Sequence, residues 1–183
     1  MILLTTSRRP TGRIRTFCRD LANSIPDTVR VNRGKMSLDG IAEKAIEVEA
    51  EKIVVVDRWQ GGPGRISLYR LGSSGLDFVP PLMLIKGIQL RREFKSVKKH
   101  GQSSVITFAP KNSLATDKIA GQLSQFFGLP AHYLDDVAGT HVIAMHLSFD
   151  CSGVLQLTFK RLQQMVEIGP RITISKLIWD VSS

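Results

Sequence analysis

The sequence predicts a mixed α/β fold built from two structurally similar halves, each with a mixed sheet and helices. Segments with helical spacing alternate with short apolar segments typical of strands, and runs of strands follow them. This pattern restarts after about residue 100, and at an offset of 89 residues Val54 coincides with Ile143 and Leu68 with Leu157. We therefore expect an internal duplication, with halves at about 1–100 and 101–183. An accidental match is the alternative.

The first half opens with a strand at residues 1–7, and a helix follows it. Apolar residues recur in the helix at intervals of three and four positions, as on one buried face. Thr11 is a candidate N-cap, and Pro26 stops the helix. The expected buried stripe is Ile14, Phe17, Cys18, Leu21 and Ile25.

A short strand at 28–31 precedes a second helix at 38–50. Ser37 is available to cap this helix, whose outer face is acidic. We expect its buried residues to be Leu38, Ile41, Ala42 and Ala45.

The other elements follow from apolar runs and turn residues. Gly128 and Pro130 end a third helix, and Gly-rich or Ser-rich stretches separate the strands. The predicted strands are 52–59, 65–71, 81–90, 103–110, 140–150, 154–160 and 169–179, and the third helix is 112–128.

Composition restricts the class of partner. The chain has 183 residues, 43% of them hydrophobic, and a formal net charge of +9, which favours a polyanion such as nucleic acid. No run approaches the roughly 18 apolar residues that a membrane span needs, so we expect no membrane partner. The first residues are apolar before they are basic, which is the wrong order for a signal peptide. We expect an intracellular, cytoplasmic protein.

The sequence contains no recognisable catalytic or cofactor motif. The glycines of residues 61–64 lack the Lys-Ser or Lys-Thr of a nucleotide loop and predict a hairpin turn. Asp135 and Asp136 are the one adjacent carboxylate pair, in a loop or short helix, without a third metal ligand at a suitable spacing. Cys18 and Cys151 are distant in sequence and are interpreted as reduced, small hydrophobic residues. We expect no catalysis, no metal and no cofactor.

A cluster of arginines surrounds the start of the first helix. Backbone N–H groups at a helix N-terminus favour anions, and the guanidinium group suits bidentate contact with phosphate. Arg15 and Arg19 lie four residues apart on one flank of the helix, away from its apolar stripe. The alternative is a solvated helix face partly paired with Asp20. The candidate nucleic-acid-binding residues here are Arg8, Arg9, Arg13, Arg15 and Arg19.

Two further basic positions join the candidate site. Arg33 and Lys35 lie in the loop before the second helix. Arg171 follows the rigid Gly169-Pro170 corner and opens the last strand, where it could be a fixed cation aimed at a phosphate. The alternatives for Arg171 are a solvated charge at a strand start, or a packing role in which it pairs with a carboxylate such as Glu167.

Four segments together resemble the Brix-domain family of ribosome-biogenesis proteins. The segments are LLTTSRRPTGRIRTFCRDL, VNRGKMSLDGIAEKA, GPGRISLYRL and EIGPRITISKL. The last is similar to the sigma-factor-like motif of that family, and the resemblance covers essentially the whole chain. The chain looks like the minimal, single-domain archaeal form, nearest the branch that acts in small-subunit ribosomal RNA processing.

This resemblance implies a single domain, 1–183, of two halves that each resemble the anticodon-binding domain of class II tRNA synthetases. It implies non-catalytic binding to ribosomal RNA or its precursor in a ribonucleoprotein, with other ribosome-assembly proteins as potential partners. A protein-interaction module within a ribonucleoprotein and an RNA-processing enzyme are the alternatives. The matching motifs contain Arg8, Arg9, Arg33, Lys35 and Arg171 as candidate RNA contacts.

Overall fold

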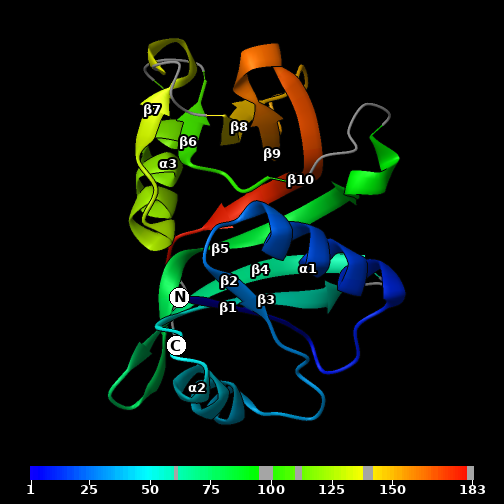
Figure 1. The fold of residues 1–183 in the computed structure, drawn as a ribbon, viewed down its shortest axis with the longest axis vertical. Coiled ribbons are helices and arrows are strands. Elements are labelled where there is room, and N and C mark those ends of the chain that lie inside the picture. The colour runs from blue at the N-terminus through cyan, green and yellow to red at the C-terminus, as the bar shows by residue number, and fades with distance from the viewer. Residues whose placement is uncertain (60–61, 95–100, 110–112, 138–141, 181–183) are drawn as a thin grey trace. The chain divides into compact units, whose positions relative to one another are not determined.

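The computed structural model confirms the mixed α/β class (Figure 1). It describes residues 1–59, 62–94, 101–109, 113–137 and 142–180, so the predicted segment ends at 110, 112 and 140 lie outside the described residues. The chain divides into two compact units, which we call unit one and unit two. Unit one is Met1–Ala22, Asp27–Ile85 and Lys176–Ser183, and unit two is Asn23–Pro26 and Lys86–Ser175.

Unit one has a mixed sheet with strand order β2-β1-β3-β4-β5. β1 pairs in parallel with both β2 and β3, whereas β3 with β4 and β4 with β5 are antiparallel. The parallel part is buried, because β1 and the middle of β3 consist of apolar and threonine side chains shielded from solvent. The strands are β1 (Ile2–Thr6), β2 (Thr28–Arg30), β3 (Lys52–Trp59), β4 (Gly62–Gly72) and β5 (Gly75–Gln89).

Two helices, α1 (Gly12–Ser24) and α2 (Leu38–Glu47), connect the parallel strands. α1 leads from β1 to β2, and α2 leads from β2 back across β1 to β3. Because such crossovers are right-handed, connections that run in opposite directions place their helices on opposite faces of the sheet. α2 accordingly packs against Leu3, Ile53 and Val55, which share one face of β1 and β3.

The local signals at the starts of these helices were correct. The Ile14 backbone N–H donates to Thr11 Oγ1 at 3.3 Å, and the Gly40 N–H donates to Ser37 Oγ at 3.1 Å, so both predicted N-caps are confirmed. The expected burial of Leu38 was wrong, since it is 44% exposed. Leu38 is the first residue of α2, one turn ahead of the stripe that faces the sheet. α2 also ends at Glu47, before the predicted residue 50.

Unit two has strand order β10-β9-β8-β6-β7, with the helix α3 (Leu114–Phe127) against β6 and β7. β6 pairs in parallel with β7 and β8, and β9 pairs antiparallel with β8 and β10. α3 ends at Gly128 in the left-handed conformation, with φ of 71°, as the sequence indicated. Phe126 of α3 is buried, and Phe127, the last residue of the helix, is half-buried. The strands are β6 (Val105–Phe108), β7 (Ala131–Tyr133), β8 (Ile143–Phe149), β9 (Leu155–Arg161) and β10 (Val166–Ile178).

The two units have the same strand order and the same pattern of parallel and antiparallel pairs, but a constant offset of 89 residues does not relate them. Val54 faces Leu68, fourteen residues further on, whereas Ile143 faces Arg161, eighteen residues further on. The chain between these paired positions is therefore four residues longer in β8 and β9 than in β3 and β4. Apolar alternation survives such an insertion, which is why the sequence match looked continuous.

Other departures from the predicted elements are local. β4 begins at Gly62, so two of the glycines assigned to a turn belong to a strand, and Gly61 lies outside the described residues. The short edge strand β7 was not predicted. Both cysteines are free thiols: Cys18 is buried, which raises its pKa to about 12, but Cys151 is exposed rather than packed as a small hydrophobic residue.

Candidate nucleic-acid interface

The loop between β1 and α1 carries the first two candidate arginines. β1 ends at Thr6, and the Ser7 backbone N–H donates to the carbonyl of Val56 at 2.9 Å, which holds the loop against the end of β3. Arg8 and Arg9 follow directly, and both are exposed. Ser7 Oγ is buried and has no hydrogen-bond partner among the described residues, which is uncommon for a hydroxyl. The loop thus presents two solvated cations beside an unsatisfied polar group.

The helix α1 adds Arg13, Arg15 and Arg19, which are all exposed. Arg15 Nη2 donates to the carbonyl of Pro10 at 3.1 Å, so this guanidinium lies back over the loop that carries Arg8 and Arg9. Asp20 is buried, with 8% of its surface exposed. Asp20 interacts with other residues of the structure, so its pairing with the arginines of the helix stays the alternative stated above.

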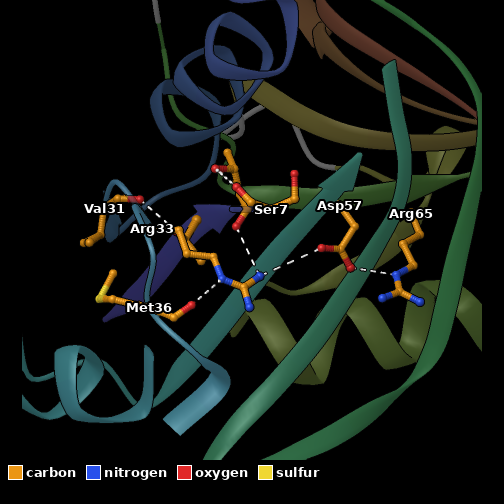
Figure 2. Close-up of polar contacts among 8 residues, drawn as sticks. Ser7, Val31, Arg33, Met36, Asp57 and Arg65 are labelled. Carbon is orange, nitrogen blue, oxygen red and sulfur yellow. Dashed lines mark hydrogen bonds and ion pairs between the residues drawn. The ribbon is translucent and has the colours of Figure 1, made fainter. Parts of the chain in front are cut away.

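Arg33 connects three segments of unit one, as Figure 2 shows. Its Nε donates to the carbonyl of Met36 at 3.1 Å, and its Nη1 donates to the carbonyl of Thr6 at 3.4 Å and lies 4.0 Å from Asp57 Oδ1. The side chain is 11% exposed. Burial lowers the pKa of Arg33, the charge of Asp57 opposes this, and the positive charge of Arg8 lowers the pKa further. The guanidinium of Arg33 is occupied by contacts within the protein, and these contacts position the loop that carries Arg8 and Arg9.

Two arginines that the sequence analysis did not select, Arg58 and Arg65, belong to the same surface. Arg58 Nη1 donates to the carbonyl of Arg9 at 3.5 Å, and Arg65 Nε lies 2.6 Å from Asp57 Oδ2 (Figure 2). Both arginines are exposed. The sequence signal for Arg58 was the polar carboxyl end of the otherwise apolar strand β3. Parallel strands bring their carboxyl ends to one edge of a sheet, so the end of β3 lies beside the loop that follows β1.

We define the basic edge as five exposed arginines of unit one that these contacts link. The contacts run through the loop after β1, the end of β3 and the start of β4. Asp57 is the one carboxylate in these contacts, and it is already paired with Arg65 and close to Arg33. A cluster with so large an excess of cations attracts a polyanion. The basic edge consists of Arg8, Arg9, Arg15, Arg58 and Arg65.

The remaining candidates of unit one lie beside this set. Lys35 is exposed in the same loop as Arg33, and Arg19 is exposed one helical turn beyond Arg15. Arg13 is exposed in the first turn of α1 and interacts with other residues of the structure.

In unit two, Arg171 is paired with Glu167, so the packing alternative stated for it is confirmed. Arg171 Nε donates to Glu167 Oε1 at 2.7 Å, its Nη2 contacts Oε2, and its guanidinium carbon lies 5.6 Å from the centroid of the Phe94 ring. Thr158 Oγ1 also donates to Glu167 Oε1. The Arg171 side chain remains 34% exposed, so a contact with RNA stays a prediction.

The electrostatics of this pair favour two charged partners. The hydrogen bond to Glu167 raises the pKa of Arg171 against the effect of burial. For Glu167, burial raises the pKa, but the hydrogen bonds from Arg171 and Thr158 and the charges of Arg171 and Lys160 outweigh burial and leave the pKa below its ordinary value. The ion pair is therefore a structural element of the β9–β10 hairpin at neutral pH.

The described residues contain no group of three or more His, Cys, Asp or Glu side chains arranged to hold a metal ion. Asp135 and Asp136 are exposed in a short helical turn, Leu134–Asp136, as the sequence suggested. His146 is buried, its Nδ1 lies 2.9 Å from Thr107 Oγ1, and burial, followed by the charge of Lys160, lowers its pKa to about 4. In the part of the chain described here, no helix has the length and apolar character that crossing a bilayer requires.

Three relatives found by comparison with known proteins share one name. No protein-family model matches the chain. A protein of Aeropyrum pernix is 42% identical over 91 residues, 49% of this chain and 50% of its own length. One of Methanopyrus kandleri is 32% identical over 131 residues, 69% of this chain and 66% of its own length. One of Pyrobaculum aerophilum is 28% identical over 97% of this chain and 95% of its own length. All three are named as probable Brix domain-containing ribosomal biogenesis proteins.

A solved structure of another protein aligns with this chain over nearly its whole length. The crystal structure of a probable ribosomal biogenesis protein from Aeropyrum pernix K1 matches with a TM-score of 0.75 and 26% identity over 97% of this chain and 98% of that one. The chain belongs to the Brix-domain family. An archaeal Imp4-like protein has the same fold, with a TM-score of 0.66 at 21% identity over 97% of this chain. This chain spans about half the length of the Aeropyrum pernix relative that is 42% identical to it. By contrast, the Pyrobaculum aerophilum relative aligns with this chain over nearly the whole length of both proteins.

Proposed function

We propose that this Brix-domain chain is a non-catalytic, cytoplasmic factor in ribosome biogenesis that binds ribosomal RNA or its precursor. The names of its relatives support the ribosome-biogenesis context. The observation that supports RNA as the ligand is the basic edge, whose five arginines have one carboxylate, Asp57, among their contacts. These arginines lie on α1, on the loop before it and on the facing ends of β3 and β4. We assign the chain to small-subunit assembly, with other assembly proteins as partners, because its motifs resemble that branch.

The chemistry of the basic edge suits a phosphate backbone. Arginine donates two parallel hydrogen bonds to phosphate oxygens and also stacks on exposed bases, which lysine does not. Arg8 and Arg9 precede the N-terminus of α1, where the partial positive charge of the helix favours an anion. Phosphate contacts of this kind carry affinity with little sequence selection.

The other candidate residues have different roles in the proposed RNA binding. Arg13, Arg19 and Lys35 extend the phosphate-binding surface beyond the basic edge. Arg33 holds the loop in place from within. Arg171 reaches RNA with the part of its guanidinium that Glu167 does not occupy.

We also propose that the whole of 1–183 is one Brix domain that arose by duplication of a unit resembling the anticodon-binding domain of class II tRNA synthetases. The common strand order of the two units supports this proposal. The duplicated unit would be β-α-β-β-β-β in essence, with α2 as an addition to the first copy.

Crosslinking in cells tests the proposed function. Irradiation of cells that express the tagged protein, followed by purification and sequencing of attached RNA, is expected to recover fragments concentrated in small-subunit ribosomal RNA and its precursor. The matched control is the protein with Arg8, Arg9 and Arg15 changed to alanine, which should recover little RNA. A recovery equal to that of the untagged background, or fragments spread over unrelated RNA, contradicts the proposal.

A further inference from the structure

The large exposed side chain of Trp59 is not explained by the fold. Trp59 is the last residue of β3 and is 70% exposed. Tryptophan usually buries a large area, because its ring is mostly apolar. Trp179, the other tryptophan of the chain, is half-buried.

The β3–β4 hairpin is shaped around Trp59. The pairing of β3 with β4 shifts register between Asp57 and Arg58, so that Arg58 faces Pro63 and Trp59 faces Gly62. At Gly64, an added Cβ would lie 2.0 Å from the Trp59 Cβ. A residue with a side chain could not occupy position 64 without moving the start of the tryptophan side chain. The bulge and the glycine therefore fix where Trp59 leaves the strand.

The immediate neighbours of Trp59 are cations of the basic edge. Arg58 precedes it and is bonded to the carbonyl of Arg9, and Arg65, one residue beyond Gly64, is bonded to Asp57. A basic protein partner would be repelled by these charges, and an apolar partner would have to desolvate them. A single-stranded nucleic acid matches both features, because it offers a phosphate to the arginines and the face of a base to the indole.

We propose that Trp59 is a stacking platform for one unpaired base of the RNA whose phosphates the basic edge holds. This inference rests on the proposed RNA-binding function. It predicts a preference for unpaired nucleotides, because the faces of bases inside a duplex are already covered by their neighbours. The contact is tolerant of base identity, since every base has an aromatic face.

Intrinsic fluorescence and affinity test the stacking contact together. The full chain is titrated with a single-stranded oligoadenylate and with an abasic oligomer that carries the same number of phosphates. Oligoadenylate is expected to quench the wild-type fluorescence, and Trp59→Phe is expected to abolish that quenching, because Trp179 then remains as the one tryptophan. Trp59→Ala is expected to weaken oligoadenylate binding about tenfold, with the salt slope unchanged. The abasic oligomer should bind wild type and Trp59→Ala equally.

The control variant is Ile46→Ala, which removes another exposed apolar side chain of unit one, 64% exposed on α2. It should leave binding and quenching unchanged. If oligoadenylate binds with a salt-dependent affinity but neither quenches Trp59 nor loses affinity in Trp59→Ala, the stacking inference is wrong and a protein becomes the occupant of this site. If neither oligomer binds even at low salt, the proposed RNA-binding function fails, and the stacking inference fails with it.

Discussion

Replacing Arg8, Arg9 and Arg15 together by alanine is expected to weaken binding to single-stranded ribosomal RNA about 50-fold at physiological salt. Each arginine that contacts a phosphate releases counterions, and each such contact adds about 0.7 to the slope of log affinity against log salt for a single strand. Losing three contacts should therefore flatten the slope by roughly two units. Fluorescence anisotropy across a salt series measures both quantities.

The fold should survive this triple change, because all three arginines are exposed and lie off the buried stripe of α1. Circular dichroism checks that expectation. The matched control is the triple variant Arg70→Ala, Lys86→Ala and Lys118→Ala, which removes the same charge from exposed positions outside the basic edge. Equal flattening of the slope in both triple variants would mean that net charge, and not the basic edge, governs binding.

Changing Arg171 to alanine is expected to destabilise the protein by about 2–3 kcal/mol at neutral pH. The change leaves Glu167 half-buried without its charged partner and removes the cation from the Phe94 ring. Urea unfolding followed by circular dichroism measures the loss. Glu167→Gln in the same background should recover part of the stability, because it removes the unpaired negative charge.

The contribution of this pair depends on pH in a defined direction. The folded state holds the pKa of Glu167 below its ordinary value, so the stabilisation is present above the unfolded pKa and is lost as the pH falls through the folded pKa. Wild type should therefore lose more stability on acidification than Glu167→Gln does. The variant Glu167→Gln also frees the guanidinium of Arg171, so unchanged or tighter RNA binding is expected from it. Weaker RNA binding with intact folding would contradict the assignment of Arg171 as an RNA contact.

The sequence predicted features that depend on neighbours along the chain. The caps at Thr11 and Ser37 and the helix end at Gly128 depend on a few adjacent residues, and all three occur in the structure. The buried stripe of α1 follows from helical periodicity alone, and its five predicted residues are buried. The short strand β7 carries too little pattern over three residues to be recognised.

Features that depend on which strands pair, and in which register, could not be predicted from the sequence. Arg58 and Arg65 join the basic edge because β3 lies beside β1 and β4 with a defined register, which periodicity does not give. Pairing with Glu167 was likewise one of the alternatives predicted for Arg171, but the sequence alone did not decide between them. Four residues of a regular strand span about 13 Å, too far for a hydrogen bond. The pairing of β9 with β10 is irregular between Glu167 and Arg171, and the two side chains meet there.

The central claim is that the basic edge binds the phosphates of single-stranded RNA, and the salt dependence of wild-type binding to a ribosomal RNA fragment tests it most directly. If the five arginines of the basic edge each contact one phosphate, log affinity should fall linearly with log salt with a slope of about −3.5. Duplex DNA of the same length should bind more weakly, because its bases are not available for stacking. A slope near zero, or equal affinity for duplex DNA and single-stranded RNA, would contradict the account.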